Sequence, residues 1–323
     1  MNQPTTMRAV AIDRFGGPEV LTLHELPVPT PGPDEVLIKV EVAGVGVWDA
    51  EERAGYLVQM SPEAVKKFPR ILGAEGAGTV AAVGAEVAGF AEGDKVYASG
   101  FLNPKGGFYA EYAAVPADQV APVPSGMPME QAGALAVAGV TALRGLADNL
   151  KLQASQHLLI FGASGGVGQP AVQLAKAMGA QVLAVVSHAD GAAVAKESGA
   201  DVVINSKTDD LTAAIAAFAP AGLDAVLAFV NGDGLEKSIA AIRAGGRLAY
   251  PHGVEPAPAG RPDVETIGFD GTPGRDVIDK LNALIERRAF YVHISHRFVL
   301  ADAAQAHRAL MDHRAGRIIL KVV

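Results

Sequence analysis

Residues 158–168 constrain the fold of this chain more than any other stretch. They begin with a short apolar run from Leu158 to Phe161, typical of a strand that is covered on both faces. Three glycines follow at intervals of three residues: Gly162, Gly165 and Gly168. Glycine permits a sharp turn and lets another backbone or a phosphate approach closely. The stretch therefore predicts a strand, a tight turn and then a helix.

This turn is interpreted as a dinucleotide-binding site. The free N–H groups and the positive dipole end at the start of a helix suit a diphosphate. A purely structural turn is the alternative, but the strand before the glycines and the helix after them favour the nucleotide. The residues expected to contact the cofactor here are Ser164, Gly165, Gly166, Val167 and Gly168.

Strand and helix patterns alternate beyond the turn, which indicates a parallel sheet with helices on both faces. Strands are expected at 181–186, 201–204, 225–230 and 247–250, and helices at 191–197, 212–218 and 235–243. Residues 257–274 are rich in proline and glycine and are expected to form a loop.

The residues after the strand at 181–186 bear on cofactor choice. An acidic side chain at the strand tip would bond the ribose of NAD and repel a 2′-phosphate. Here Ser187 and His188 occupy the tip and are expected to donate to a 2′-phosphate, whereas Asp190 lies past it. Lys207, after the next strand, is expected to help bind this phosphate. The pattern favours NADPH over NADH.

Two further strand ends are expected to hold the nicotinamide. Ligands of α/β sheets bind at the carboxyl ends of the strands. Val230 and Asn231 stand at one such end, and His252 and Gly253 at another. His252 has a surface-loop role as its alternative.

Composition limits the classes of partner. The chain has 323 residues, which favours two domains, and a net charge of −8 without a long run of either sign. Nucleic acid is therefore not an expected partner. The absence of cysteine excludes disulfides, catalytic thiolates and cysteine metal sites. With no signal-like or membrane-spanning segment, we expect a soluble, cytoplasmic protein.

Several motifs along the chain resemble one family. They are the segments 43–49, 72–78, 93–96, 107–112 and 139–142, followed by the glycine turn. In this order they are similar to the medium-chain dehydrogenase/reductase superfamily, and most of all to its zinc-free quinone oxidoreductase branch.

The resemblance implies an α/β fold of two domains. A GroES-like catalytic domain, built on a distorted β-barrel, would comprise residues 1–123 and 258–323. A Rossmann domain with a doubly wound parallel sheet would comprise residues 124–257. The resemblance also implies a homodimer, and it places Thr141 near the nicotinamide.

Two departures from the family concern the metal. Zinc-dependent relatives have a cysteine where Gly46 stands and a histidine where Ala74 stands, and neither replacement can ligate zinc. We therefore expect no metal. Quinone reductases often carry asparagine at the position of Gly46, so the substrate geometry is expected to differ.

Aromatic side chains near the expected cleft are candidates for the chemistry. Trp48, the only tryptophan, is expected to touch the substrate, with packing as its alternative. Tyr56 is the candidate proton donor, with water or plain packing as alternatives. Residues 56–68, with a helical pattern at 61–68, are expected to edge this cleft.

The expected function is that of a zinc-independent, NADPH-dependent reductase. Its hydride would pass to a quinone or an α,β-unsaturated carbonyl, which are small molecules that need no metal. A zinc-free alcohol or ketone oxidoreductase is one alternative. A non-catalytic NADPH-binding sensor or interaction protein is another, because a fold does not by itself establish an activity.

Overall fold

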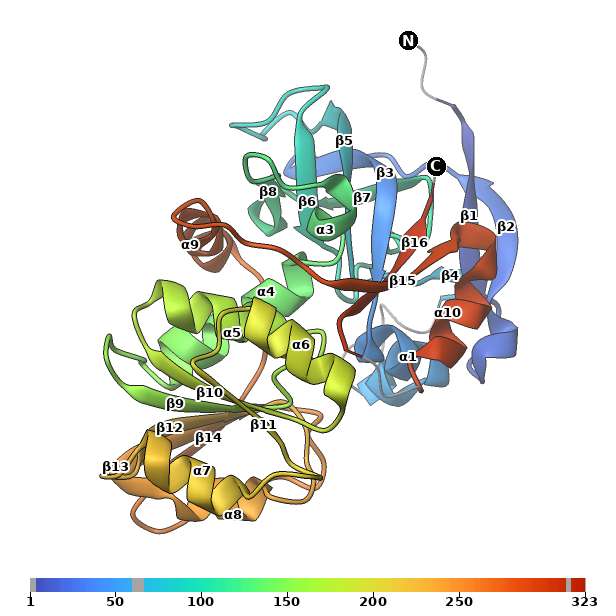
Figure 1. Cartoon of the computed structure of the whole chain (residues 1–323). Helices are drawn as coiled ribbons and strands as arrows, with labels where there is room; N and C mark the ends of the chain where they lie inside the picture. Colours follow the sequence, from blue (N-terminus) through green and yellow to red (C-terminus); the bar gives the residue numbers. More distant parts are fainter. Residues whose placement is uncertain (1–3, 60–66, 312–314, 323) are drawn as a thin grey trace.

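The structure is a computed structural model that describes residues 4–59, 67–311 and 315–322. Figure 1 shows a parallel sheet flanked by helices in one half of the molecule and mostly antiparallel strands in the other, called here the antiparallel half. Both ends of the chain lie in the antiparallel half, so the chain leaves this half and later returns to it. None of the helices in the described ranges is long and apolar enough to cross a membrane.

The parallel sheet has six strands in the order β11-β10-β9-β12-β13-β14. The chain runs outward from β9 through β10 to β11 and then crosses back to β12, so the order reverses beside β9. This switch point is where sheets of this kind bind ligands. The strands are β9 (His157–Phe161), β10 (Gln181–Val186), β11 (Val202–Asn205), β12 (Leu223–Ala228), β13 (Ile242–Pro251) and β14 (Glu265–Phe269).

Helices cover both faces of this sheet, as the sequence predicts. Leu158 and Ile160 pack into a core shared with α4, α5 and α9, whereas Leu159 and Phe161 pack into a core shared with α7 and α8. Alternate residues of one apolar strand thus serve opposite faces. These helices are α4 (Ala136–Leu143), α5 (Gly168–Ala177), α6 (Ala189–Glu197), α7 (Leu211–Phe218), α8 (Leu235–Ala240) and α9 (Arg275–Ile285).

The expectation of a loop throughout residues 257–274 is wrong for its middle part. Residues 265–269 form β14, which pairs in parallel with β13 at the edge of the sheet. Only Phe269 of this strand is buried, because an edge strand is not covered on both faces. The apolar run that marks the inner strands is therefore missing. The sheet consequently extends one strand past residue 257.

The antiparallel half consists of two sheets around a separate core. In one, β15, β16, β3, β5, β6 and β8 follow one another and β7 also pairs with β3; the other has the order β2-β1-β4. The strands are β1 (Thr6–Ile12), β2 (Thr22–Pro27), β3 (Glu35–Val45), β4 (Arg70–Ile71), β5 (Glu75–Val83), β6 (Lys95–Ser99), β7 (Tyr112–Pro116), β8 (Val120–Pro122), β15 (Ile294–Val299) and β16 (Arg317–Lys321).

The chain closes on its own beginning. β16 pairs antiparallel with β3, so that Ile318 lies opposite Val45. The last strand therefore lies in the same sheet as β3, close to the start of the chain. The described residues also form the helices α1 (Val47–Ala54), α3 (Met129–Ala132) and α10 (Ala303–Ala309), with a π-helical turn at Arg144–Asn149 and 3-10 turns at Pro18–Val20, Tyr56–Gln59, Ala117–Gln119 and Leu300–Asp302.

Candidate active site

The glycine turn lies between β9 and α5, at the switch point of the sheet. Gly162 has a φ of 86°, a backbone conformation that residues other than glycine rarely adopt. A Cβ on Gly168 would come within 2.1 Å of the carbonyl oxygen of Gly162. Both glycines are therefore needed for the backbone to turn this tightly into the helix.

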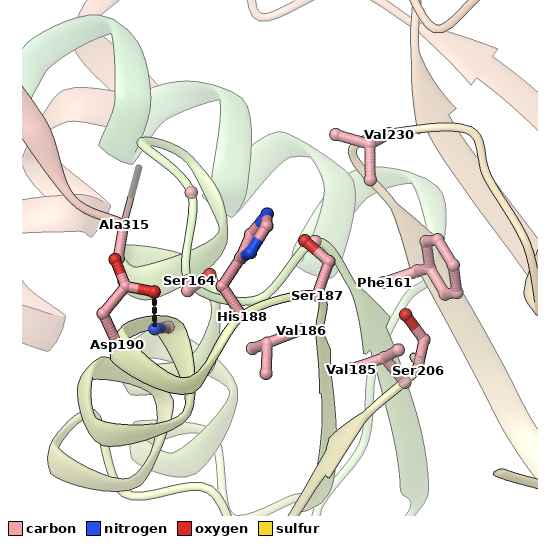
Figure 2. Close-up of a pocket in the computed structure, with 13 residues that line it drawn as sticks. Phe161, Ser164, Val185, Val186, Ser187, His188, Asp190, Ser206, Val230 and Ala315 are labelled. Atoms are coloured by element: carbon pink, nitrogen blue, oxygen red, sulfur yellow. Dashed lines mark hydrogen bonds between the residues drawn. The ribbon is translucent and has the colours of Figure 1, made fainter. Parts of the chain in front are cut away.

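A cavity of about 140 Å³ opens beside this turn (Figure 2). Five of the residues predicted to bind the cofactor line it: Ser164, Gly165, Ser187, His188 and Val230. The other lining residues are Phe161, Gly162, Val185, Val186, Asp190, Gly191, Ser206 and Ala315. The turn and the tips of β10 and β11 thus contribute to one site.

Some polar side chains of this cavity can bind a phosphate, and one acidic side chain would repel it. Ser187, His188 and Ser206 offer hydrogen-bond donors, and Figure 2 draws them around the tip of β10. Asp190 also lines the cavity, and one of its carboxylate oxygens accepts a hydrogen bond of 2.9 Å from the N–H of Gly191. The sequence puts Asp190 past the strand tip, but the first turn of α6 brings it back into the site.

Several other predicted cofactor residues do not line this cavity. They are Gly166, Val167, Gly168, Lys207, Asn231 and Gly253. The backbone N–H of Lys207 donates to the side chain of Asn205, and the side-chain amide of Asn231 donates to the carbonyl of Pro256. Their predicted contacts with a cofactor stay predictions.

Arg317 is a site residue that the sequence analysis missed. It is buried, and its Nη1 lies 2.7 Å from where a Cβ on Gly166 would stand. Its guanidinium forms an ion pair with Glu75, while its Nε has no hydrogen-bond partner within the described part of the chain. A cation therefore lies against the glycine turn with one donor still to satisfy. Nothing local in the sequence marks it, because β16 reaches the turn only through the closure of the fold.

Asp49 joins the two positions at which zinc-dependent relatives carry metal ligands. Its carboxylate accepts a 2.8 Å hydrogen bond from the N–H of Gly46 and another of 2.8 Å from the N–H of Ala74. Asp49 is buried at the start of α1, and this burial raises the pKa of its carboxyl to about 7. Each carboxylate oxygen of Asp49 thus accepts a hydrogen bond from one backbone amide.

The residues at this place do not fit a zinc ion. Gly46 has no side chain and Ala74 has only a methyl group, so neither supplies a ligand. Residues 4–59, 67–311 and 315–322 contain no group of three histidine, aspartate or glutamate side chains placed to hold a metal. The expectation of a metal-free site stays a prediction, based on the residue types at these two positions.

A second cavity, of about 240 Å³, lies between the two halves of the molecule. Trp48 and Phe101 form part of its wall, with their rings 5.1 Å apart and nearly edge to face. The other lining residues are Ser99, Val137, Thr141, Pro251, Phe269, Asp270, Gly271, Thr272 and Pro273. Pro251 and Phe269 end β13 and β14, so this cavity opens at the same carboxyl edge of the sheet as the first.

Some polar side chains at the second cavity already have partners within the protein. The hydroxyl of Thr141 donates to the carbonyl of Val137 over 2.8 Å. Nδ1 of His252 lies 2.9 Å from a carboxylate oxygen of Asp270, which itself lines the cavity. The structure thus brings the predicted residues Trp48 and Thr141 to the cavity wall and His252 to its margin.

Tyr56 lies elsewhere. Its side chain is 76% exposed on the 3-10 turn after α1 and does not line either cavity. The helix expected at 61–68 falls mostly outside the described residues. Sequence reasoning also missed Ser99, Phe101 and Asp270, since each lies in a loop or at a strand end without a recognisable motif.

Comparisons with known proteins agree with this architecture. Residues 32–125 match the family described as alcohol dehydrogenase GroES-like domain, and residues 166–259 match the family described as zinc-binding dehydrogenase. The quinone oxidoreductase of Pseudomonas aeruginosa is 31% identical, over 93% of this chain and 94% of that protein.

Two solved structures are similar throughout. An NAD-dependent alcohol dehydrogenase has a TM-score of 0.86 and 29% identity, covering 98% of this chain and 100% of its own. A mycobacterial protein complexed with NADPH has a TM-score of 0.83 and 29% identity, again covering 98% and 100%.

A dinucleotide-type cavity at the switch point, next to an apolar cleft closed by a GroES-like domain, defines a nicotinamide-dependent oxidoreductase of the two-domain type. The chain belongs to the medium-chain dehydrogenase/reductase superfamily, in its quinone oxidoreductase-like branch.

Proposed function

We propose that this protein is a metal-independent, NADPH-dependent reductase of quinones or α,β-unsaturated carbonyl compounds. The observation that carries the proposal is the second cavity, whose lining is largely apolar. Trp48 of this lining follows Gly46 by two residues, and Ser99 pairs with Glu75, the neighbour of Ala74. The cavity walls suit a flat conjugated molecule better than a small polar alcohol, because three aromatic rings and two prolines are among the lining residues.

The two cavities together suit a dinucleotide. Both open at the carboxyl edge of one sheet, the first at β9 to β11 and the second at β13 and β14. In this proposal the amides of the glycine turn and the guanidinium of Arg317 hold the diphosphate. Ser187, His188 and Ser206 bind the 2′-phosphate.

The nicotinamide end would lie toward the second cavity. The cofactor supplies a hydride when bound, and the protein supplies orientation and electrostatics. Thr141 and the segment after β14 would fix the ring against the acceptor. A conjugated acceptor spreads the arriving negative charge onto an oxygen, so it requires hydrogen-bond donors rather than a metal ion.

Water is the proposed proton source. Tyr56 was the residue candidate, but its 76% exposure outside both cavities favours solvent. The acceptor cleft also reaches solvent at Thr272, which is exposed. The homodimer implied by the family resemblance remains part of this proposal.

A zinc-free alcohol or ketone oxidoreductase is the second candidate. The similarity to an NAD-dependent alcohol dehydrogenase favours it. A simple ketone, however, cannot spread negative charge by conjugation, and the described lining of the second cavity contains no histidine, lysine or arginine that could compensate. Asp190 in the first cavity likewise favours NADH, against the three donor side chains around it.

One assay separates these candidates. Oxidation of NADPH and of NADH is followed at the absorbance of the reduced nicotinamide with matched panels of quinones, enones and saturated ketones, with and without a chelator. We expect NADPH-dependent, chelator-insensitive turnover of the conjugated acceptors. Chelator-sensitive activity, or activity confined to saturated ketones and alcohols, would overturn the proposal.

A further inference from the structure

Ser99, in the wall of the second cavity, has a buried hydroxyl that is unpaired within the described part of the chain. It is the last residue of β6 and lies opposite Glu75 in the ladder with β5. The residue is only 1% exposed, and its Oγ has no hydrogen-bond partner among the residues that the structure describes. Buried hydroxyls are normally paired, so an unpaired one at a cavity wall points to a missing partner.

The other polar side chains in this wall either make a hydrogen bond within the protein or are at least partly exposed to solvent. Thr141 already donates its proton to the carbonyl of Val137. Asp270 has carboxyl oxygens and no hydroxyl of the serine type, and one of them lies 2.9 Å from Nδ1 of His252. Thr272 is exposed, and the indole of Trp48 is partly exposed. Ser99 is therefore the one fully buried hydroxyl donor still free in the described lining.

The surroundings of Ser99 determine what kind of partner suits it. The lining includes the apolar side chains of Phe101, Val137 and Phe269, and the ring of Phe101 packs edge to face on that of Trp48. A mainly hydrocarbon ligand with an acceptor atom at one point therefore suits this space. Rotation about the Cα–Cβ bond of serine moves Oγ among three staggered positions, which lets the hydroxyl turn toward such an atom.

We propose that Ser99 donates a hydrogen bond to the carbonyl oxygen of the acceptor and stabilises the negative charge that develops there. This inference rests on the proposed reductase function and adds its oxygen-binding residue. The site would thereby select acceptors that place one carbonyl oxygen at Ser99 and an apolar ring or chain against Trp48.

Atoms and electrons balance in this step. A hydride from the reduced nicotinamide forms a C–H bond at the acceptor's β-carbon, while the C–H bond that held it breaks and the nicotinamide is oxidised. The displaced π electrons move to the carbonyl oxygen, where the hydroxyl of Ser99 holds the enolate. Water then protonates the α-carbon, and Ser99 keeps its own proton throughout.

Trp48 allows this contact to be measured without any turnover. It is the only tryptophan of the chain and lines the same cavity as Ser99, so its fluorescence reports occupancy. The protein is loaded with oxidised NADP⁺ and titrated with cyclohexanone. A parallel titration uses methylenecyclohexane, in which a CH₂ group replaces the oxygen at nearly the same shape.

We expect the Ser99→Ala variant to bind cyclohexanone about 10-fold more weakly than the unaltered protein, as loss of one neutral hydrogen bond implies. Binding of methylenecyclohexane should be unchanged. The matched control is Ser238→Ala, which removes a buried hydroxyl that already donates to Gly234; it should leave both titrations unaltered. The melting temperature of Ser99→Ala should be no lower than that of the unaltered protein, because no existing hydrogen bond is lost.

Turnover gives the second readout. With 2-cyclohexenone and NADPH, Ser99→Ala should lower kcat by roughly 100-fold or more, since the bond strengthens as charge develops on the oxygen. Equal losses for the ketone and the hydrocarbon, or no loss for either, would overturn the role of Ser99. Ser99-dependent ketone binding in a protein that reduces no conjugated acceptor would instead refute the proposed function and leave the oxygen contact standing.

Discussion

The guanidinium of Arg317 forms a buried ion pair with the carboxylate of Glu75, although 242 positions separate them in the sequence. The other oxygen of Glu75 accepts a 2.6 Å hydrogen bond from the N–H of Val137. Arg317 also lies against Gly166 of the glycine turn. One ion pair thus connects the closing strand, the antiparallel half and the nucleotide-binding half.

The first prediction concerns stability. Arg317→Leu leaves the carboxylate of Glu75 buried without a counter-charge, which should lower the free energy of unfolding by about 3–5 kcal/mol. The control is Arg243→Leu, which breaks the 2.8 Å surface pair with Asp224 and should cost less than about 1 kcal/mol. Urea denaturation measures both, and equal losses would show that the buried pair has no special weight.

A second prediction concerns the glycine turn. Gly168→Ala should destabilise the protein by roughly 1–3 kcal/mol and abolish coenzyme binding, because its Cβ would overlap the Gly162 carbonyl. At Gly165 the nearest atom to a new Cβ is 3.4 Å away, so Gly165→Ala should change stability by less than about 1 kcal/mol. It should still weaken coenzyme binding, since Gly165 lines the first cavity. Calorimetric titration of both variants checks this; normal binding by Gly168→Ala would contradict it.

The third prediction concerns His188 and the 2′-phosphate. The imidazole lines the first cavity and can donate a hydrogen bond to a phosphate oxygen. His188→Ala should therefore weaken NADPH binding by about 10-fold and leave NADH binding within about twofold. Asp190, the acidic group in the same cavity, is unchanged in this variant. Calorimetric titration measures both affinities, and equal losses for the two coenzymes would remove His188 from this role.

A fourth prediction follows from the pKa of Asp49, which burial raises to about 7 in the folded protein, with Glu52 and Glu75 adding to the rise. Between the ordinary aspartate range and pH 7 the folded state holds a proton that the unfolded state releases, so stability should fall as pH rises. Asp49→Asn removes this titration. The asparagine amide has one acceptor oxygen, so it can accept a hydrogen bond from only one of the two backbone N–H groups that Asp49 binds. Its stability deficit should therefore be larger at pH about 5 than at pH about 8. A deficit that is constant with pH, measured by denaturant unfolding, would refute the assignment.

The fifth prediction concerns Tyr56. Because its side chain is 76% exposed and does not line either cavity, Tyr56→Phe should leave kcat within about twofold of the unaltered enzyme. A solvent isotope effect of the same size in both proteins would agree with water as the proton source. A large fall in kcat with unchanged KM would restore Tyr56 as the proton donor.

The nucleotide-binding half was largely readable from the sequence. Leu158 to Phe161, the glycines after them and the alternating strands and helices follow local rules of periodicity and turn geometry, and the structure confirms the fold class that they predict. The edge strand β14 was missed because exposure on one side removes the apolar pattern. The sequence predicts Asp190 to lie past the strand tip and outside the site. In the structure it lines the first cavity, because the first turn of α6 carries it back toward the tip.

The sequence by itself determined the sheet, the glycine turn and the unsuitability of Gly46 and Ala74 as metal ligands, since each depends on residue type and short-range spacing. Only the tertiary structure brought Arg317 to the turn, Asp49 to two backbone amides and Ser99 to the wall beside Trp48. The reason is physical: these contacts join segments that meet only when β16 closes on β3 and the two halves enclose a cleft, and no local pattern encodes that closure.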